Sequence, residues 1–165
     1  MEILLLTVLI VLNGAFAMSE IALVTSRRAR LVRLADEGDR AASVAIQLHD
    51  DPTRFLSTVQ VGITSIGILN GIIGQAALAG PLSAWLQTLG MRNEASGIAA
   101  TALVVILITY VTIVIGELVP KRIGQIDPER MACRLARPMQ LLARLARPFV
   151  RLLSASTDAL LRLFA

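Results

Sequence analysis

The chain has 165 residues and a net charge of +4, and 55% of its residues are hydrophobic, 17% charged and 4% aromatic. Soluble domains carry about 25% charged residues, and here the apolar residues form long runs, so the composition indicates an all-helical (all-α) integral membrane protein. The scarcity of aromatic residues and the lack of a Gly-rich phosphate loop exclude nucleic acid as a partner, a lone cysteine (Cys133) excludes an internal disulfide, and a lone histidine (His49) makes a zinc site unexpected.

The first predicted span covers residues 3–24, which at about 1.5 Å per residue cross about 30 Å of hydrocarbon. Ala15-Phe16-Ala17 resembles a signal-peptidase site. However, Glu2 rather than a basic residue precedes the apolar run, and the run continues past Ala17. We therefore expect an uncleaved membrane span.

Residues 27–49 have an amphipathic pattern, and Gly38 is expected to divide them into two short belt helices on the cytoplasmic surface. The second span is predicted over residues 55–79. Pro81 follows this span, and a short segment that contains Trp85 comes next.

The third span is predicted over residues 95–119 and is expected to stop at Pro120. Asp51-Pro52 and Asp127-Pro128 are both typical of a helix start, because the acid can cap the helix and proline suits its first position. Residues 128–165 are therefore predicted to form a juxtamembrane helix and tail.

The juxtamembrane helix carries six arginines on one face and apolar residues on the other, which suits a bilayer surface with anionic headgroups. These arginines are Arg130, Arg134, Arg137, Arg144, Arg147 and Arg151. An Arg-Leu-Ala-Arg-Pro repeat at 134–138 and 144–148 predicts a kink at each proline.

Positive charge is distributed unevenly between the predicted connections. Six arginines lie between the first and second spans and nine basic residues follow the third, whereas only Arg92 lies between the second and third. The positive-inside rule therefore places residues 26–54 and 120–165 in the cytoplasm. We expect a multi-pass protein of the plasma (inner) membrane with its N-terminus outside and its C-terminus in the cytoplasm.

Polar residues inside a span are costly in hydrocarbon and should face a cavity or a partner. The first span carries Asn13, Ser19 and Glu20. Hydrogen bonds between helices would account for the amide and the hydroxyl, and pairing with Arg27 or snorkelling toward the cytoplasmic interface would account for Glu20. A binding site is the alternative interpretation for all three.

The second span has a stripe of small and polar residues that includes Gly67-x-x-x-Gly71, a close-packing motif. Asn70 borders this stripe, and an amide surrounded by glycines has room to coordinate a ligand. Packing remains the simpler interpretation of the glycines themselves.

The third span ends in a cluster of groups that carry oxygen. Pro120 cannot donate to the carbonyl of Gly116, which releases that oxygen, and Glu117 places a carboxylate beside it. Together with a serine hydroxyl and an asparagine amide, these groups form the oxygen set that hard cations such as Mg²⁺ prefer.

Three motifs occur in order in the three spans. They read Asn13-Gly-x-Phe16-x-x-Ser19-Glu20-x-Ala22-Leu23, then Phe55-Leu-Ser-Thr-Val-Gln-Val-Gly-Ile-Thr64 with Gly67-Ile-Leu-Asn-Gly71, then Gly116-Glu-Leu-Val-Pro-Lys121. Together they resemble the transmembrane domain of the CNNM/CorB/CorC (cyclin-M-like) magnesium transporter family, and the resemblance covers most of residues 1–150.

The resemblance implies a homodimer with three transmembrane helices per subunit and a cytoplasmic belt. It implies Mg²⁺ held in a cavity open to the cytoplasm, with export coupled to Na⁺. The ligands that it implies are Ser19, Asn70, Glu117 and main-chain oxygen near Gly116. The residues that would support this site or bind sodium are Asn13, Glu20, Gly71, Thr112, Pro120 and Lys121.

Members of that family usually continue into paired CBS domains that bind ATP-Mg, whereas this sequence stops at Ala165, so nucleotide regulation is not assigned to its residues. We expect Mg²⁺ transport by alternating access around the intramembrane site. A non-transporting membrane scaffold or Mg²⁺ sensor that acts through partner proteins is the alternative. An intramembrane enzyme is not expected, because no Ser/Lys, paired-Asp or His-Glu-x-x-His arrangement occurs.

Overall fold

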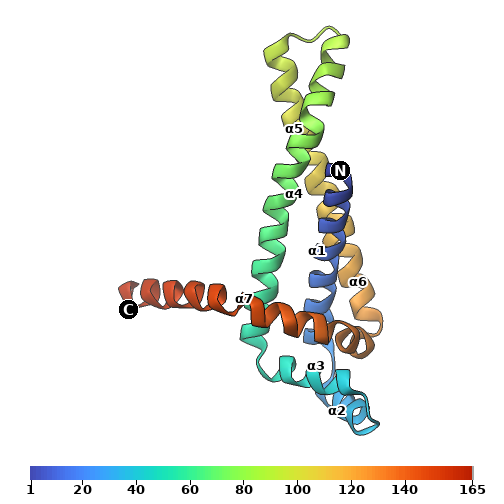
Figure 1. Ribbon diagram of the computed structural model, residues 1–165, viewed down its shortest axis with the longest axis vertical. Helices are drawn as coiled ribbons and strands as arrows, with labels where there is room; N and C mark the ends of the chain where they lie inside the picture. The colour runs from blue at the N-terminus through green and yellow to red at the C-terminus, as the bar shows by residue number, and fades with distance from the viewer. Residues whose placement is uncertain (165) are drawn as a thin grey trace. The chain divides into compact units, whose positions relative to one another are not determined.

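The computed structural model describes residues 1–164 and shows an all-helical chain (Figure 1). Its elements, in order, are α1 (Glu2–Thr25), α2 (Arg28–Asp36), α3 (Arg40–Asp50), α4 (Pro52–Thr88), α5 (Asn93–Ile113), the π-helix η1 (Val114–Leu118), α6 (Val119–Ile126) and α7 (Pro128–Phe164). Three stretches are long and apolar enough to cross a membrane: Glu2–Thr25, Pro52–Thr88 and Asn93–Ile126. The predicted fold class is confirmed.

The chain forms two compact units, which are described separately. Unit 1 comprises Met1–Ala17 and Ile63–Pro120, and unit 2 comprises Met18–Gly62 and the chain from Lys121 onward. Each unit therefore takes its residues from the first, second and third spans, so side chains far apart in sequence come together within it.

In unit 1, α4 and α5 form an antiparallel hairpin (Figure 1). Gly90, with a φ of 92°, supplies the positive φ that the turn between them requires. Polar side chains close this end, because the Gln87 amide donates to Asn93 Oδ1 at 2.9 Å and to Ser96 Oγ at 3.0 Å. Farther along the hairpin, Gly74 lets α4 approach the Ile108 side chain of α5.

The first part of α1 packs closely against η1 in unit 1. A Cβ atom at Gly14 would lie 2.9 Å from Pro120 Cγ, and one at Gly116 would lie 3.4 Å from the main-chain oxygen of Ile10. These two glycines therefore allow backbone and ring atoms to approach where a larger side chain would force the helices apart.

Two prolines that follow predicted spans lie inside helices rather than at their ends. The predicted second span, 55–79, lies inside α4, which continues through Pro81 to Thr88. The predicted third span, 95–119, lies inside a helical stretch that continues past Pro120, because η1 leads directly into α6. Pro120 lies within this continuous stretch, and its missing N–H leaves the Gly116 carbonyl without the donor that an α-helix would supply.

Unit 2 contains the two belt helices, α2 and α3, separated at Gly38 as predicted (φ 97°). Asp39 caps α3 by accepting a hydrogen bond from the Ala41 amide at 2.7 Å. Asp51 and Asp127 accept hydrogen bonds from the Arg54 and Arg130 amides, each at 3.4 Å, which confirms both predicted caps.

The juxtamembrane helix α7 buries one face against the belt. Small residues and Met139 form this face, and the Gln140 side chain donates to Gln47 of α3 at 3.1 Å. The buried small residues are Ala132, Cys133, Ala136 and Ala143. The predicted arginine face is exposed, and both prolines lie inside one helix whose direction changes along its length (Figure 1).

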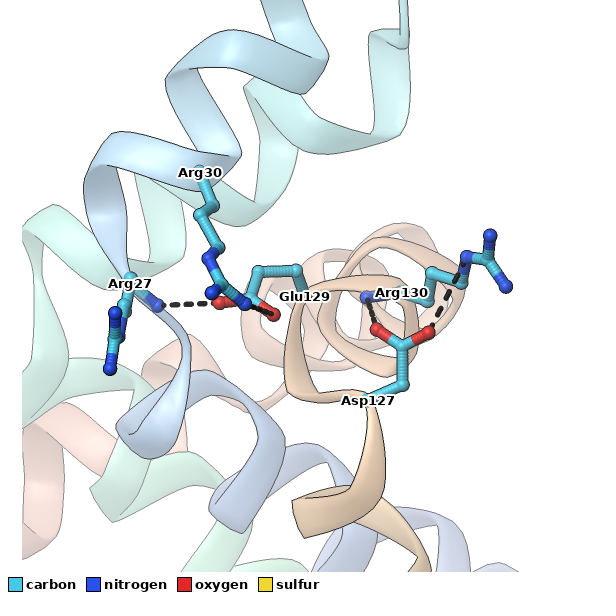
Figure 2. A network of polar contacts seen from close by, with 5 residues as sticks. All are labelled: Arg27, Arg30, Asp127, Glu129 and Arg130. Carbon is cyan, nitrogen blue, oxygen red and sulfur yellow. Dashed lines mark hydrogen bonds and ion pairs between the residues drawn. The ribbon is translucent and has the colours of Figure 1, made fainter.

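A buried carboxylate joins α7 to the end of α1 and the start of α2 (Figure 2). Glu129 is only 6% exposed. Its Oε1 accepts a hydrogen bond from the Arg27 amide at 3.1 Å, and its Oε2 lies 3.7 Å from the Arg30 guanidinium. Because both oxygens have partners, the burial of this charge is compensated.

Replacing Glu129 with alanine should lower the free energy of unfolding by about 1–3 kcal/mol, because the Arg27 amide then loses its buried partner. The matched control is Glu37→Ala, which removes an exposed ion pair with Arg33 and should change stability by less than about 0.5 kcal/mol. Thermal unfolding in detergent, followed by circular dichroism, measures both. Equal effects of the two substitutions would contradict this role for Glu129.

Candidate functional site

The π-helix η1 and Asn13 form the centre of the candidate site in unit 1. Val119 N–H bonds to the carbonyl of Val114, five residues back, which is the π-helical pattern. The Asn13 Nδ2 donates to the carbonyl of Gly116 at 2.9 Å, and this bond is buried. The sequence predicts a released carbonyl at Gly116, and the structure shows that carbonyl bonded to the first span.

Four buried polar atoms have no hydrogen-bond partner among the described residues. They are Asn13 Oδ1, Asn70 Oδ1, Asn70 Nδ2 and Thr112 Oγ1, and all belong to unit 1. Asn70 is the extreme case, because it is 1% exposed and neither end of its amide is satisfied. An unsatisfied buried amide costs about 1–3 kcal/mol, so Asn70 is a candidate for a partner outside the described residues.

The glycines of the second span border open space rather than a neighbouring helix. A Cβ atom at Gly67 or Gly71 would have no neighbour within 4 Å, so the predicted close packing of this motif is not found within the described chain. Both glycines instead line a cavity of about 160 Å³ together with Thr109 and Thr112 of α5.

Glu117 is the carboxylate of the candidate site in unit 1. It lies in η1, directly after Gly116, and it is half-buried. The irregular helix therefore carries both the carbonyl held by Asn13 and the adjacent acid. Substitution of either neighbour would disturb the geometry of the other.

The other predicted residues lie in unit 2. Ser19 is buried at 3% exposure. Glu20 and Lys121 form an ion pair with 3.4 Å between Oε2 and Nζ, so the partner of Glu20 is Lys121 rather than Arg27. In the same unit, Gly124 allows α6 to approach the main-chain oxygen of Met18, which positions Lys121 beside the first span.

The predicted ligands are thus shared between the two units. Asn70, Gly116 and Glu117 belong to unit 1, whereas Ser19 belongs to unit 2. Within residues 1–164, no group of three or more His, Cys, Asp or Glu side chains lies in position to hold a metal ion. The available donors are therefore mainly amide, hydroxyl and carbonyl oxygens, with one carboxylate, and such a set suits hard cations.

Sequence reasoning missed the π-helix and the hydrogen bond that Asn13 makes to it. One signal was present, because Pro120 lies four residues after Gly116 and so cannot complete the α-helical ladder. Nothing in the pattern indicated which side chain would reach the carbonyl.

Comparison with known proteins finds one family model and several relatives that match nearly the whole chain. A family model described as the cyclin M transmembrane N-terminal domain matches residues 4–165. The UPF0053 protein sll0260 of Synechocystis sp. is 48% identical over 99% of the chain, and the polyamine export protein of Salmonella typhimurium is 36% identical over 94%. The polyamine export protein of Escherichia coli (strain K12) is 35% identical over 99%. The chain spans 37%, 35% and 36% of the lengths of these three relatives.

Two alanine substitutions test whether the side-chain amide of Asn13 stabilises the fold and whether that of Asn70 is instead available for a ligand. Asn13→Ala should lower stability by about 1–2 kcal/mol, because the Gly116 carbonyl loses its donor. Asn70→Ala removes an amide that has no partner among the described residues and should leave stability unchanged or raise it. Chemical unfolding of the two purified variants in detergent compares them. A larger loss for Asn70→Ala than for Asn13→Ala would show that Asn70 has a structural partner.

Proposed function

Because the chain belongs to the cyclin M (CNNM) transmembrane N-terminal domain family, we propose that it transports Mg²⁺ across a membrane through a site lined by oxygen atoms. The observation that carries the proposal is the buried, unpaired amide of Asn70 in the second span. A polar group in such a position is typically functional, because hydrocarbon gives it no other partner.

The proposed site uses groups from all three spans. Mg²⁺ takes about six oxygen ligands and gives up its waters reluctantly. Within unit 1, Asn70 Oδ1, the Glu117 carboxylate and the Gly116 carbonyl would supply three ligands, and waters would complete the shell. Ser19, the other predicted ligand, belongs to unit 2. Because a carbonyl oxygen has two lone pairs, the bond from Asn13 leaves Gly116 able to bind a cation.

The remaining candidates support this arrangement. Asn13 holds the carbonyl in place, and Pro120 leaves that carbonyl without its α-helical donor. Gly71 and Thr112 line the neighbouring cavity and would admit water or Na⁺. The ion pair between Glu20 and Lys121 would open when a cation passes, because the Glu20 carboxylate can bind a metal ion in place of the Lys121 ammonium group.

The assembly belongs to the proposal too. We expect a homodimer in the plasma membrane, with the N-terminus outside, the belt helices in the cytoplasm and export of Mg²⁺ coupled to Na⁺ entry. The charge distribution supports the orientation, because α2, α3 and α7 carry most of the arginines.

Polyamine transport is a second candidate, favoured by the names of the Salmonella and Escherichia relatives. A polyamine carries several separated ammonium groups, and each of them requires an anionic or carbonyl partner. The proposed site has one carboxylate, that of Glu117 in η1, beside amide, hydroxyl and carbonyl oxygens. This donor set fits a small hard cation better than a long polycation.

Flux measurements distinguish these cargoes from each other and from a sensor or scaffold. In proteoliposomes, Asn70→Ala and Glu117→Gln should abolish Mg²⁺ flux, while the exposed control Glu94→Gln should retain it. Both site variants should keep the dimer, as measured by light scattering. Unchanged flux in both site variants would reject the site, and putrescine flux without Mg²⁺ flux would reject the cargo. Mg²⁺ binding without any flux would favour the sensor.

Cysteine labelling tests the orientation. Burial raises the pKa of the Cys133 thiol, with further contributions from Asp39 and Glu129, so the native cysteine should react slowly and give a low background. A cysteine replacing Glu94 should react with an impermeant maleimide in intact cells, whereas one replacing Asp36 should react only after permeabilisation. The reverse pattern would overturn the proposed orientation.

A further inference from the structure

A groove follows unit 2 between α7 and the first turns of α4. It consists of three adjoining hollows of about 280, 460 and 390 Å³. Neighbouring hollows have lining residues in common: the first two share Asp51, Arg54 and Arg147, and the last two share Thr53, Ser57 and Val150. The hollows are therefore one continuous groove along the two helices.

One end of the groove is strongly basic. Four arginines line the first two hollows, namely Arg54 of α4 and Arg144, Arg147 and Arg151 of α7, and Asp51 is the one acid among the lining residues that the structure describes. Within the described part of the chain, none of the four guanidinium groups has an ion pair or a hydrogen bond. Unpaired guanidinium groups on both sides of a hollow suit a phosphate, whose oxygens accept two donors from each arginine.

The other end of the groove has apolar side chains on both helices, beside the polar side chains of Thr53, Ser57, Gln60 and Thr157. Val61, Val150 and Leu153 line the third hollow. The basic end lies at the first residues of α4, which is a candidate membrane span from Pro52 onward. The groove thus combines a basic end at the start of a span with a more apolar end farther along it.

We propose that this groove binds one anionic phospholipid, with Arg54, Arg147 and Arg151 holding its phosphodiester and the Val150–Leu153 end contacting an acyl chain. A free phosphate would use only the basic end and would leave the apolar lining without a role. The groove also differs from the rest of the arginine face, because Arg134 and Arg137 lie on α7 but do not line it.

Spin-labelled lipids test the groove directly. The full chain is reconstituted in vesicles with nitroxide-labelled phosphatidylglycerol or phosphatidylcholine, and electron paramagnetic resonance measures the motionally restricted fraction of each lipid. The groove variant is Arg147→Gln with Arg151→Gln, and the matched control is Arg134→Gln with Arg137→Gln. Both remove two charges from α7.

The groove variant should lose about fivefold or more of the preference for phosphatidylglycerol, roughly the effect of one basic residue near an anionic surface. The control should keep its preference. If the double variant does not fold, the single variant Arg54→Gln should show the same loss.

Three results would overturn the proposal. An equal loss in the control would show that overall charge, rather than the groove, selects the lipid. Stabilisation by inorganic phosphate that requires Arg147 and Arg151, without any lipid preference, would show a site for a free anion. If the unchanged chain shows no lipid preference and the groove variant loses the dimer, a second copy of the chain covers the groove.

Discussion

The hydrogen bond from Asn13 to the carbonyl of Gly116 is the contact on which the proposed site depends. In apolar surroundings every polar backbone group requires a partner, and Pro120 removes the partner that an α-helix would give this carbonyl. The π-helix and the Asn13 side chain resolve the conflict together. They keep an irregular, oxygen-rich segment ordered within a span, with Glu117 in the same turn.

The helices, belt and caps follow from local sequence. Gly38 separates the two belt helices, and Asp51 and Asp127 cap the helices that follow them, because each effect involves residues that are close in the chain. The ends of the helices near Pro81 and Pro120 do not follow from local sequence, and both helices continue through the proline. Whether Pro81 or Pro120 ends a helix depends on neighbouring elements and on a π-turn, and the local pattern records neither.

The sequence also identified polar residues worth attention without identifying their partners. Asn70 was predicted to have room for a ligand, and it is buried with its amide unpaired. Glu20 was paired with the wrong residue, because Lys121 is a hundred positions away in the chain and only the fold brings the two together. The groove along α7 was not foreseen either, since it forms from two helices whose registry cannot be read from either helix alone.

The proposed function requires that the Asn70 amide, which has no hydrogen-bond partner among the described residues, binds a cation. The most direct test is a pair of experimental structures determined with Mg²⁺ and with chelator. The account predicts a difference-density peak about 2.0–2.1 Å from Asn70 Oδ1, with Glu117 or the Gly116 carbonyl also contacting it. An Asn70 amide that is hydrogen-bonded to protein in both structures, with no ion beside it, would contradict the account.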